Sequence, residues 1–360
     1  MNKILYIIAT VMLLSCGRDD SESVKMKMEP VISSYVAIGS DPYPRNTEGD
    51  CIELEDGTLL CAFTRFEGYA DIAPSCIVGA LSRDHGRTWS VPTIICGNIG
   101  LQNVMSVSLI EVNQKIHLYF LIKNSDTDLQ VYRMIMTDGY KWGKPECIQM
   151  PLGYCVVVNG AVVYSNESRL YIPVCFFDKS PATLEDKSKC FYLYSDDEGN
   201  SWDKSDQVVI DESKYGGLEP TIVELSSDKV LMSMRTDLGF QYFAYFDHNG
   251  KLVKGPVRSS LPSSDSPAHL ISLKHGELLA VHNNCDVDMR NRLSISLSLD
   301  EGDSWNEEFI LEESANEKNS FSYPSLKKVG DRLLITYWEF LVNHYSYSLK
   351  FASLDLNVFL

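Results

Sequence analysis

The chain has 360 residues, with 32 Lys and Arg against 49 Asp and Glu, which gives a formal net charge of −17. This acidic balance argues against nucleic acid or anionic lipid as the main partner, because phosphate binding requires a positive face. A hydrophobic content of 44% is sufficient for a sizeable core and excludes a disordered chain.

The N-terminal residues have the pattern of an export signal. Lys3 precedes an apolar run over 4–14, which is shorter than the about 20 residues that a membrane span needs. The run ends in LLSCG, which resembles a bacterial lipobox, and an acidic segment follows its cysteine. We therefore expect a signal peptide over 1–15 and a polar tether over 16–30 that is lipidated at Cys16. The lipid would hold the protein to the bacterial outer membrane, at the cell surface or on the periplasmic face, and a plain secretory signal is the alternative.

Nine further cysteines follow Cys16. Their number is odd, none forms a CxxC pair, and several lie in apolar runs. Free cysteine behaves as a small buried hydrophobe, and a disulfide framework is unusual in a chain of this length. We expect core residues, with one bridged pair as the alternative. The nine are Cys51, Cys61, Cys76, Cys96, Cys147, Cys155, Cys175, Cys190 and Cys285.

From residue 31 onward, short apolar or alternating runs recur and helical periodicity is almost absent. Each run has about the length of one strand, is rich in β-branched and aromatic residues, and is bounded by Gly, Asp, Asn or Lys. This pattern predicts an all-β fold. The runs lie at 58–63, 115–121, 169–175, 229–234, 277–282 and 332–338.

An octapeptide repeat is superimposed on these runs. SRDHGRTW at 82–89 recurs as SDDEGNSW at 195–202 and as SLDEGDSW at 298–305, and eroded copies lie at 137–142 and 247–250. The aspartates at 84, 138, 197, 247 and 300 are separated by 54, 59, 50 and 53 residues. A period near fifty residues, built from short strands, is typical of propeller blades.

Five marked units and a final unmarked unit over 331–355 predict a six-bladed β-propeller that extends over 31–360. We expect a strand near 31–38 to close the final unit.

The repeat has the residue types of a structural turn. Glycine supplies a positive φ, Asp and Ser bind the amides of the turn, and Trp buries a large area between neighbouring blades. The octapeptide is identified as the Asp-box, also called the BNR repeat. Because it occurs in sialidases and in unrelated propellers, it predicts architecture rather than chemistry.

The sequence contains no motif for a cofactor or a metal. It has no GxSxG elbow, no HExxH, no phosphate-binding glycine loop and no Cys/His cluster at metal spacing. We expect no cofactor, and we expect any chemistry to come from charged residues near strand ends.

Those charged residues resemble the catalytic set of the sialidase superfamily over residues 40–345. Members of this family hold the substrate carboxylate with three arginines, protonate the leaving oxygen with an Asp, and attack with a Tyr that a Glu assists. By resemblance, Arg45 is the first arginine, before the turn DGTLL, and Asp71 on the next loop is the acid. Glu219 in LEP is the assisting Glu, and Arg235 is the second arginine.

The remaining members of the set lie near the C-terminus. Arg292 resembles the third arginine, with Arg290 in reserve, and Tyr323 in FSYP resembles the nucleophile. Around Arg45 the family motif is altered, and the carboxylates of Glu48 and Asp50 follow it closely. This departure leaves the identity of the substrate open.

The resemblance carries a chemical logic. Guanidinium groups bind a carboxylate through charge-assisted, partly bidentate hydrogen bonds. A neutral phenol avoids the repulsion that a carboxylate nucleophile would meet, and a Tyr nucleophile is the known exception of sialidases to the two-carboxylate scheme. Asp71, which we expect to be partly buried, would act first as general acid and then as base.

The resemblance implies an exo-glycosidase, an exo-α-sialidase that releases terminal sialic acid with retention. The alternatives are a hydrolase or lyase that acts on another acidic glycan, and a non-catalytic glycan-binding surface lipoprotein. The expected partners are sialylated or other acidic glycans, with no nucleic acid, with membrane contact only through the lipid, and with the protein a monomer.

Overall fold

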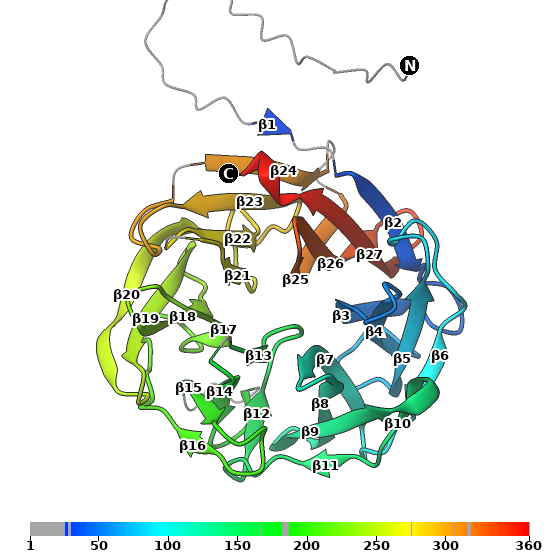
Figure 1. Ribbon diagram of the computed structural model, residues 1–360, viewed down its shortest axis with the longest axis horizontal. Coiled ribbons are helices and arrows are strands. Elements are labelled where there is room, and N and C mark those ends of the chain that lie inside the picture. Colours follow the sequence, from blue (N-terminus) through cyan, green and yellow to red (C-terminus); the bar gives the residue numbers. More distant parts are fainter. Residues whose placement is uncertain are drawn as a thin grey trace, which may run out of the picture.

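The computed structural model describes residues 26–27, 30–165, 167–181, 187–274, 276–305, 307–314 and 318–359. Its β-sheets lie around a central axis, as in a β-propeller, with β3, β7, β13, β17, β21 and β25 near the axis (Figure 1). The predicted all-β fold is therefore confirmed. The predicted signal peptide and Cys16 lie outside the described residues.

One sheet joins the two ends of the chain. Its strand order is β25-β26-β27-β3-β4-β5-β6, and β2 also pairs with β27. Strands β27 and β3 are parallel where Tyr347 meets Arg45, and the other pairs of this sheet are antiparallel. The strands are β2 (Ile32–Ala37), β3 (Arg45–Glu53), β4 (Leu59–Phe66), β5 (Ser75–Ser82), β6 (Thr93–Cys96), β25 (Ser320–Val329), β26 (Arg332–Leu341) and β27 (Ser346–Asp355).

A ten-stranded sheet follows around the ring. Its main order is β16-β15-β14-β12-β9-β8-β7, with β10 and β11 on β9 and β13 on β14. The strands are β7 (Asn103–Val112), β8 (Lys115–Ser125), β9 (Asp128–Thr137), β10 (Lys141–Trp142), β11 (Glu146–Cys147), β12 (Tyr154–Val156), β13 (Val163–Tyr164), β14 (Leu170–Phe177), β15 (Lys189–Ser195) and β16 (Asp203–Lys204).

Two smaller sheets complete the ring. One has the order β17-β18-β19-β20 and the other β1-β24-β23-β22-β21. Short 3₁₀ turns lie at Asp138–Tyr140 and Leu356–Val358. The strands are β17 (Leu218–Glu224), β18 (Lys229–Arg235), β19 (Phe240–Asp247), β20 (Leu252–Pro262), β21 (His269–Ser272), β22 (Leu278–His282), β23 (Arg292–Ser298), β24 (Glu307–Glu313) and β1 (Met26–Lys27).

The final sheet group closes as the sequence predicts. Strand β2 pairs antiparallel with β27, and Ile32 lies opposite Ser353. The N-terminal strand of the propeller therefore joins the C-terminal strands, which ties the two ends of the described ring together.

The Asp-boxes form the predicted structural turns. In the first copy, the Thr88 amide donates a hydrogen bond to Oδ1 of Asp84 at 2.9 Å, and the Gly86 amide donates one to Oγ of Ser82 at 2.8 Å. The copies at 195–202 and 298–305 make the same contacts. Trp89 packs edge-on against Phe351 of β27, with 5.3 Å between ring centroids. The box thus joins neighbouring groups of strands.

The hydrophobic core is divided into clusters between adjacent groups of strands. Six of the nine cysteines after Cys16 are buried and all nine are free thiols, which fits the expectation of core residues. Cys147 differs, because it lies exposed on the short edge strand β11. In the part of the chain that the structure describes, no helix is long and apolar enough to cross a membrane.

Candidate active site

Four strands at the central axis share one irregularity. In β3, β7, β17 and β25 the pairing register shifts near the start of the strand, as it does at a β-bulge. At each shift one residue other than glycine has a positive φ, between 43° and 56°: Glu48, Ser106, Glu219 and Tyr323. Such backbone strain persists where the surrounding fold imposes it, and it is concentrated at functional sites. Three of these four side chains carry acid–base groups.

Tyr323 and Glu219 contact one another directly. The phenol of Tyr323 donates a hydrogen bond to Oε1 of Glu219 at 2.6 Å. Arg235 donates from Nη1 to Oε2 of the same carboxylate at 2.6 Å, and its Nη1 lies 3.4 Å from the Tyr323 oxygen. The structure therefore brings together these three residues singled out by the sequence, as a phenol, a base and a cation.

Asp265, on the segment before β21, organises the arginines of the site. Its Oδ1 accepts a hydrogen bond from Nε of Arg235 at 2.6 Å, and its backbone carbonyl accepts one from Nη2 of Arg290 at 2.8 Å. The backbone carbonyl of Arg290 in turn accepts the amide of Phe321, two residues before Tyr323. As a result the Arg290 guanidinium lies over the Tyr323 ring, 5.6 Å from its centroid.

Arg292, the third arginine that the resemblance predicts, does not join this cluster. Arg292 begins β23 and lies opposite Glu313 of β24, to which its Nε and Nη2 donate at 2.9 and 2.6 Å. This cross-strand ion pair draws the side chain toward the neighbouring outer strand. Arg290, the reserve candidate, occupies the place beside Tyr323 instead.

Arg45 and Asp71 also lie together. Arg45 donates from Nη1 to Oδ1 of Asp71 at 2.6 Å and from Nη2 to Oε1 of Glu48 at 2.8 Å. Asp71 was expected to be partly buried, and this is wrong: its side chain is 72% exposed, because it lies on the open loop between β4 and β5. Glu48 is the buried carboxyl group of this trio.

Aromatic rings join the Arg45 group to the Tyr323 group. The Arg45 guanidinium lies 5.9 Å from the Tyr347 ring, Tyr347 packs on Trp338 at 5.3 Å, and Trp338 stacks with Tyr323 at 6.2 Å. The amide of Asn159 adds a second link, because it donates to the backbone carbonyls of both Gly49 and Tyr323. The two groups therefore form one site around the axis.

The charges of the site act on Tyr323. Burial raises the pKa of its phenol above the usual range, and the adjacent Glu219 carboxylate raises it further. Arg235 and Arg290 oppose this shift. The phenol is thus neutral at rest, and its proton is directed at Glu219, the group able to accept it when the oxygen forms a bond.

The arginines differ in what they can still bind. Arg45 uses Nε for Thr47, Nη1 for Asp71 and the Tyr69 carbonyl, and Nη2 for Glu48. Within the described residues, no hydrogen bond engages Nη2 of Arg235, nor Nε and Nη1 of Arg290. Arg235 and Arg290 therefore offer the available donors to an anion.

Sequence reasoning missed several residues of the site. Asp265, Trp338 and Tyr347 lie outside any motif, and only the folded ring brings them to the others. The sequence shows Glu48 as a carboxylate near Arg45 but indicates no role for it. The shared bulge could not be seen in the sequence, since its four residues are of three different types.

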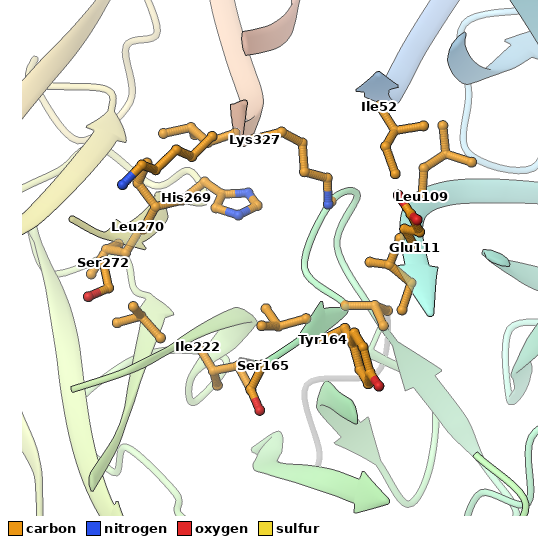
Figure 2. Close-up of a pocket in the computed structure, with 18 of the residues that line it drawn as sticks. Ile52, Leu109, Glu111, Tyr164, Ser165, Ile222, His269, Leu270, Ser272 and Lys327 are labelled. Carbon is orange, nitrogen blue, oxygen red and sulfur yellow. The ribbon is translucent and has the colours of Figure 1, made fainter. Parts of the chain in front are cut away.

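A separate pocket lies at the other end of the same strands. It has a volume of about 530 Å³, and the side chains of His269 and Lys327 lie toward its interior (Figure 2). Its walls include Ile52, Leu109 and Ile222, which follow the bulges of β3, β7 and β17. None of the predicted site residues lines it. Among the described residues, no group of three His, Cys, Asp or Glu side chains is arranged to hold a metal ion.

Comparisons with known proteins agree with this architecture. A family model described as a BNR repeat-like domain matches residues 57–335. No curated protein matches the sequence.

Several solved structures have a similar fold. A Dyadobacter fermentans protein of unknown function has a TM-score of 0.70 and 18% identity, over 91% of this chain and 98% of that one. A Hadza microbial sialidase has a TM-score of 0.73 and 15% identity, over 91% of this chain and 69% of that one. Trypanosoma rangeli sialidase has a TM-score of 0.71 and 17% identity, over 92% of this chain and 61% of that one. This chain thus spans about three fifths of the trypanosomal sialidase, and at these identities the likeness concerns the fold.

Proposed function

The chain belongs to the BNR repeat-like domain family, and from this premise we propose that it is an exo-α-sialidase that cleaves terminal sialic acid from glycans with retention. The observation that carries the proposal is the hydrogen bond from Tyr323 to Glu219, with Arg235 on the other carboxylate oxygen. A phenol held against a base, beside arginines with available donors, suits attack on a sugar that carries its own carboxylate.

The proposed first step forms a bond between the Tyr323 oxygen and the anomeric carbon. The phenolic proton passes to Glu219, and the bond from the anomeric carbon to the leaving oxygen breaks as Asp71 protonates that oxygen. In the second step Asp71 takes a proton from water, the water oxygen bonds to the anomeric carbon, and Tyr323 leaves and regains its proton from Glu219. Two displacements at one carbon retain its configuration.

Arg235 and Arg290 would hold the substrate carboxylate. Their unengaged N–H groups are the ones described above, and guanidinium groups match a carboxylate through paired hydrogen bonds. Arg45 would complete the set from β3. Because Glu48 and Asp71 already neutralise Arg45, a hydrolase or lyase acting on another acidic glycan is the second candidate function. Binding of an acidic glycan without turnover is the third.

Release of fluorophore from a 4-methylumbelliferyl sialoside by the purified protein tests the first proposal. We expect turnover by the wild type and its loss in Tyr323→Phe and Arg235→Ala, with far-UV circular dichroism showing that both variants fold. A folded wild type that releases no fluorophore would overturn the sialidase proposal. A panel of other acidic glycans then tests the second candidate, and binding without product release would indicate the third.

Two ligands of the trypanosomal sialidase provide further probes. Trypanosoma rangeli sialidase has been solved with the inhibitor DANA and with 2,3-difluorosialic acid as a covalent intermediate. If the proposed function is right, the first compound should bind the site described here and the second should label it.

We also infer six blades. The antiparallel groups begin with β3, β7, β12, β17, β21 and β25, and hydrogen bonds between β12 and β9 and between β27 and β3 join neighbouring groups into larger sheets. The five boxes and the final unmarked group support this number.

We further propose that the mature protein is a monomer anchored in the outer membrane through a lipid on Cys16. The lipobox-like LLSCG supports the anchor. Replacing Cys16 by Ser should move the protein from the membrane fraction to the soluble fraction of the producing cell. Unchanged membrane association of this variant would contradict the anchor.

A further inference from the structure

Glu48 has no part in the mechanism proposed above, although it lies in the site. It occupies the bulge of β3, in the same left-handed conformation as Glu219 in β17 and Tyr323 in β25. The fold therefore presents Glu48 toward the axis in the same way as the proposed base and nucleophile. A glutamate is an unfavourable choice for a left-handed backbone position, where glycine would be unstrained.

The two carboxylate oxygens of Glu48 have different surroundings. Oε1 accepts Nη2 of Arg45 at 2.8 Å, whereas Oε2 is sealed from solvent and has no hydrogen-bond partner within the described residues. The side chain as a whole is only 9% exposed. A charged carboxylate oxygen is unfavourable when it is buried without a hydrogen-bond partner. Protonation of Oε2 removes this charge and so lowers the cost of burial.

The groups that face Glu48 come from several elements. Arg45 on its own strand favours the charged form, while Asp71 on the loop after β4 and Glu219 on β17 disfavour it. Burial is the largest effect, and together these influences raise the pKa of Glu48 to about 7. The positive charge of Arg235 is directed at Glu219 and Asp265 rather than at Glu48.

We propose that Glu48 is a positioning residue that controls whether Arg45 can bind an anionic substrate group. With Glu48 protonated, its carboxyl group no longer balances Arg45, and the guanidinium can share its charge with a ligand. With Glu48 ionised, its carboxylate neutralises the guanidinium across the 2.8 Å contact. The inference rests on the proposed function only in taking the anionic group to be the carboxylate of a sialic acid.

Ligand affinity should depend on pH, because only the form with Glu48 protonated is able to bind the anion. Affinity is highest below pH 7 and falls as pH rises above it, because the competent fraction decreases. By reciprocity, an anionic ligand favours protonation of Glu48, so binding above pH 7 takes up protons. The pKa values of Arg45 and Arg235 are raised by the carboxylates beside them, so both stay charged throughout this range.

Calorimetric titration with DANA at pH 6 and pH 8 tests the proposal on the purified full chain. For the wild type we expect affinity about tenfold weaker at pH 8, since about one tenth of Glu48 is then protonated. Titrations at pH 8 in buffers of different ionisation enthalpy should show proton uptake. Glutamine has nearly the shape of glutamate but does not titrate. In Glu48→Gln we therefore expect the DANA affinities at pH 6 and pH 8 to agree within about twofold, with no proton uptake on binding.

Glu53→Gln is the matched control. Glu53 lies at the other end of β3 and pairs with Arg332, away from the site. It should reproduce the wild-type pH dependence. Wild-type DANA binding with no pH dependence and no proton uptake would overturn the role of Glu48 while leaving the proposed function intact.

Failure of the folded wild type to bind DANA at either pH would count against the proposed function instead. The protonation of Glu48 can then be tested without a ligand, by an infrared difference spectrum between the wild type and Glu48→Gln. A protonated-carboxyl band present at pH 6 and absent at pH 8 is expected. Absence of that band at pH 6 would overturn the proposal for Glu48.

Discussion

The Tyr323 phenol donates a 2.6 Å hydrogen bond to Oε1 of Glu219, although 104 positions separate the two residues in the chain. Both occupy left-handed bulge positions near the start of strands at the axis. A bulge turns a side chain away from the regular alternation of a strand. The strained backbone thus places the Tyr323 phenol and the Glu219 carboxylate at the same end of the ring.

Glu219→Gln should lower kcat by about 10²- to 10⁴-fold with little change in KM, because glutamine keeps the shape but cannot take the phenolic proton. Steady-state kinetics with the fluorogenic sialoside measures this. Glu224→Gln, at the far end of the same strand and hydrogen-bonded to Tyr171, is the control and should leave kcat unchanged. Equal losses in the two variants would show that β17 is merely disturbed.

Arg290→Ala and Arg292→Ala should differ in their effect on ligand affinity. Loss of a charged hydrogen bond from Arg290 should weaken DANA binding by about tenfold to a hundredfold. Arg292 pairs with Glu313 outside the cluster, so its loss should change the affinity by less than about twofold. A larger loss in Arg292→Ala than in Arg290→Ala would restore the arginine that the sequence pattern favoured.

Asp50→Asn should destabilise the fold. The Asp50 side chain is fully buried, and its oxygens accept the Leu109 amide, the Ser325 hydroxyl and the Lys327 ammonium. Asparagine would leave Lys327 without its counter-charge, so we expect a loss of about 3 kcal/mol in the free energy of unfolding. Denaturant unfolding measures it.

The control for Asp50 is Asp303→Asn, which breaks an exposed pair with Lys254 and should cost less than about 1 kcal/mol. If the two variants were equally stable, the buried carboxylate would not link the strands as described.

Gly86→Ala should be more destabilising than Gly57→Ala. Both glycines have positive φ, but a Cβ at Gly86 would lie 2.2 Å from the Phe351 ring, whereas a Cβ at Gly57 meets nothing within 4 Å. We expect about 1 kcal/mol for Gly57→Ala from backbone strain and about 2–4 kcal/mol for Gly86→Ala, where overpacking adds to it. Thermal unfolding of both variants checks the difference, and equal melting temperatures would contradict the packing of the first Asp-box.

Local chemistry explains what the sequence predicted correctly. The Asp-boxes predicted the turns because Ser82, Asp84 and Gly86 act within a few residues of one another. The spacing of the boxes indicated a ring of short-stranded units. The strand expected near 31–38 to complete the final unit is β2, which pairs with β27. Tyr323 and Glu219, which only the family resemblance singled out, lie in hydrogen-bond contact, and their roles stay predictions.

The errors arose where placement depends on distant strands. Arg290 and Arg292 are two residues apart, and only the cross-strand pair with Glu313 and the contact with Asp265 separate their positions. The exposure of Asp71 depends on the course of an open loop. The environment of Glu48 depends on β17 and on the loop after β4 as well as on its own strand.

Covalent trapping tests the central claim most directly. The purified protein is incubated with 2,3-difluorosialic acid, digested with a protease, and its peptides are sequenced by mass spectrometry. We predict one fluorosialyl adduct on Tyr323, which is absent from Tyr323→Phe. An adduct on another residue, or turnover of the sialoside without any adduct, would contradict Tyr323 as the nucleophile.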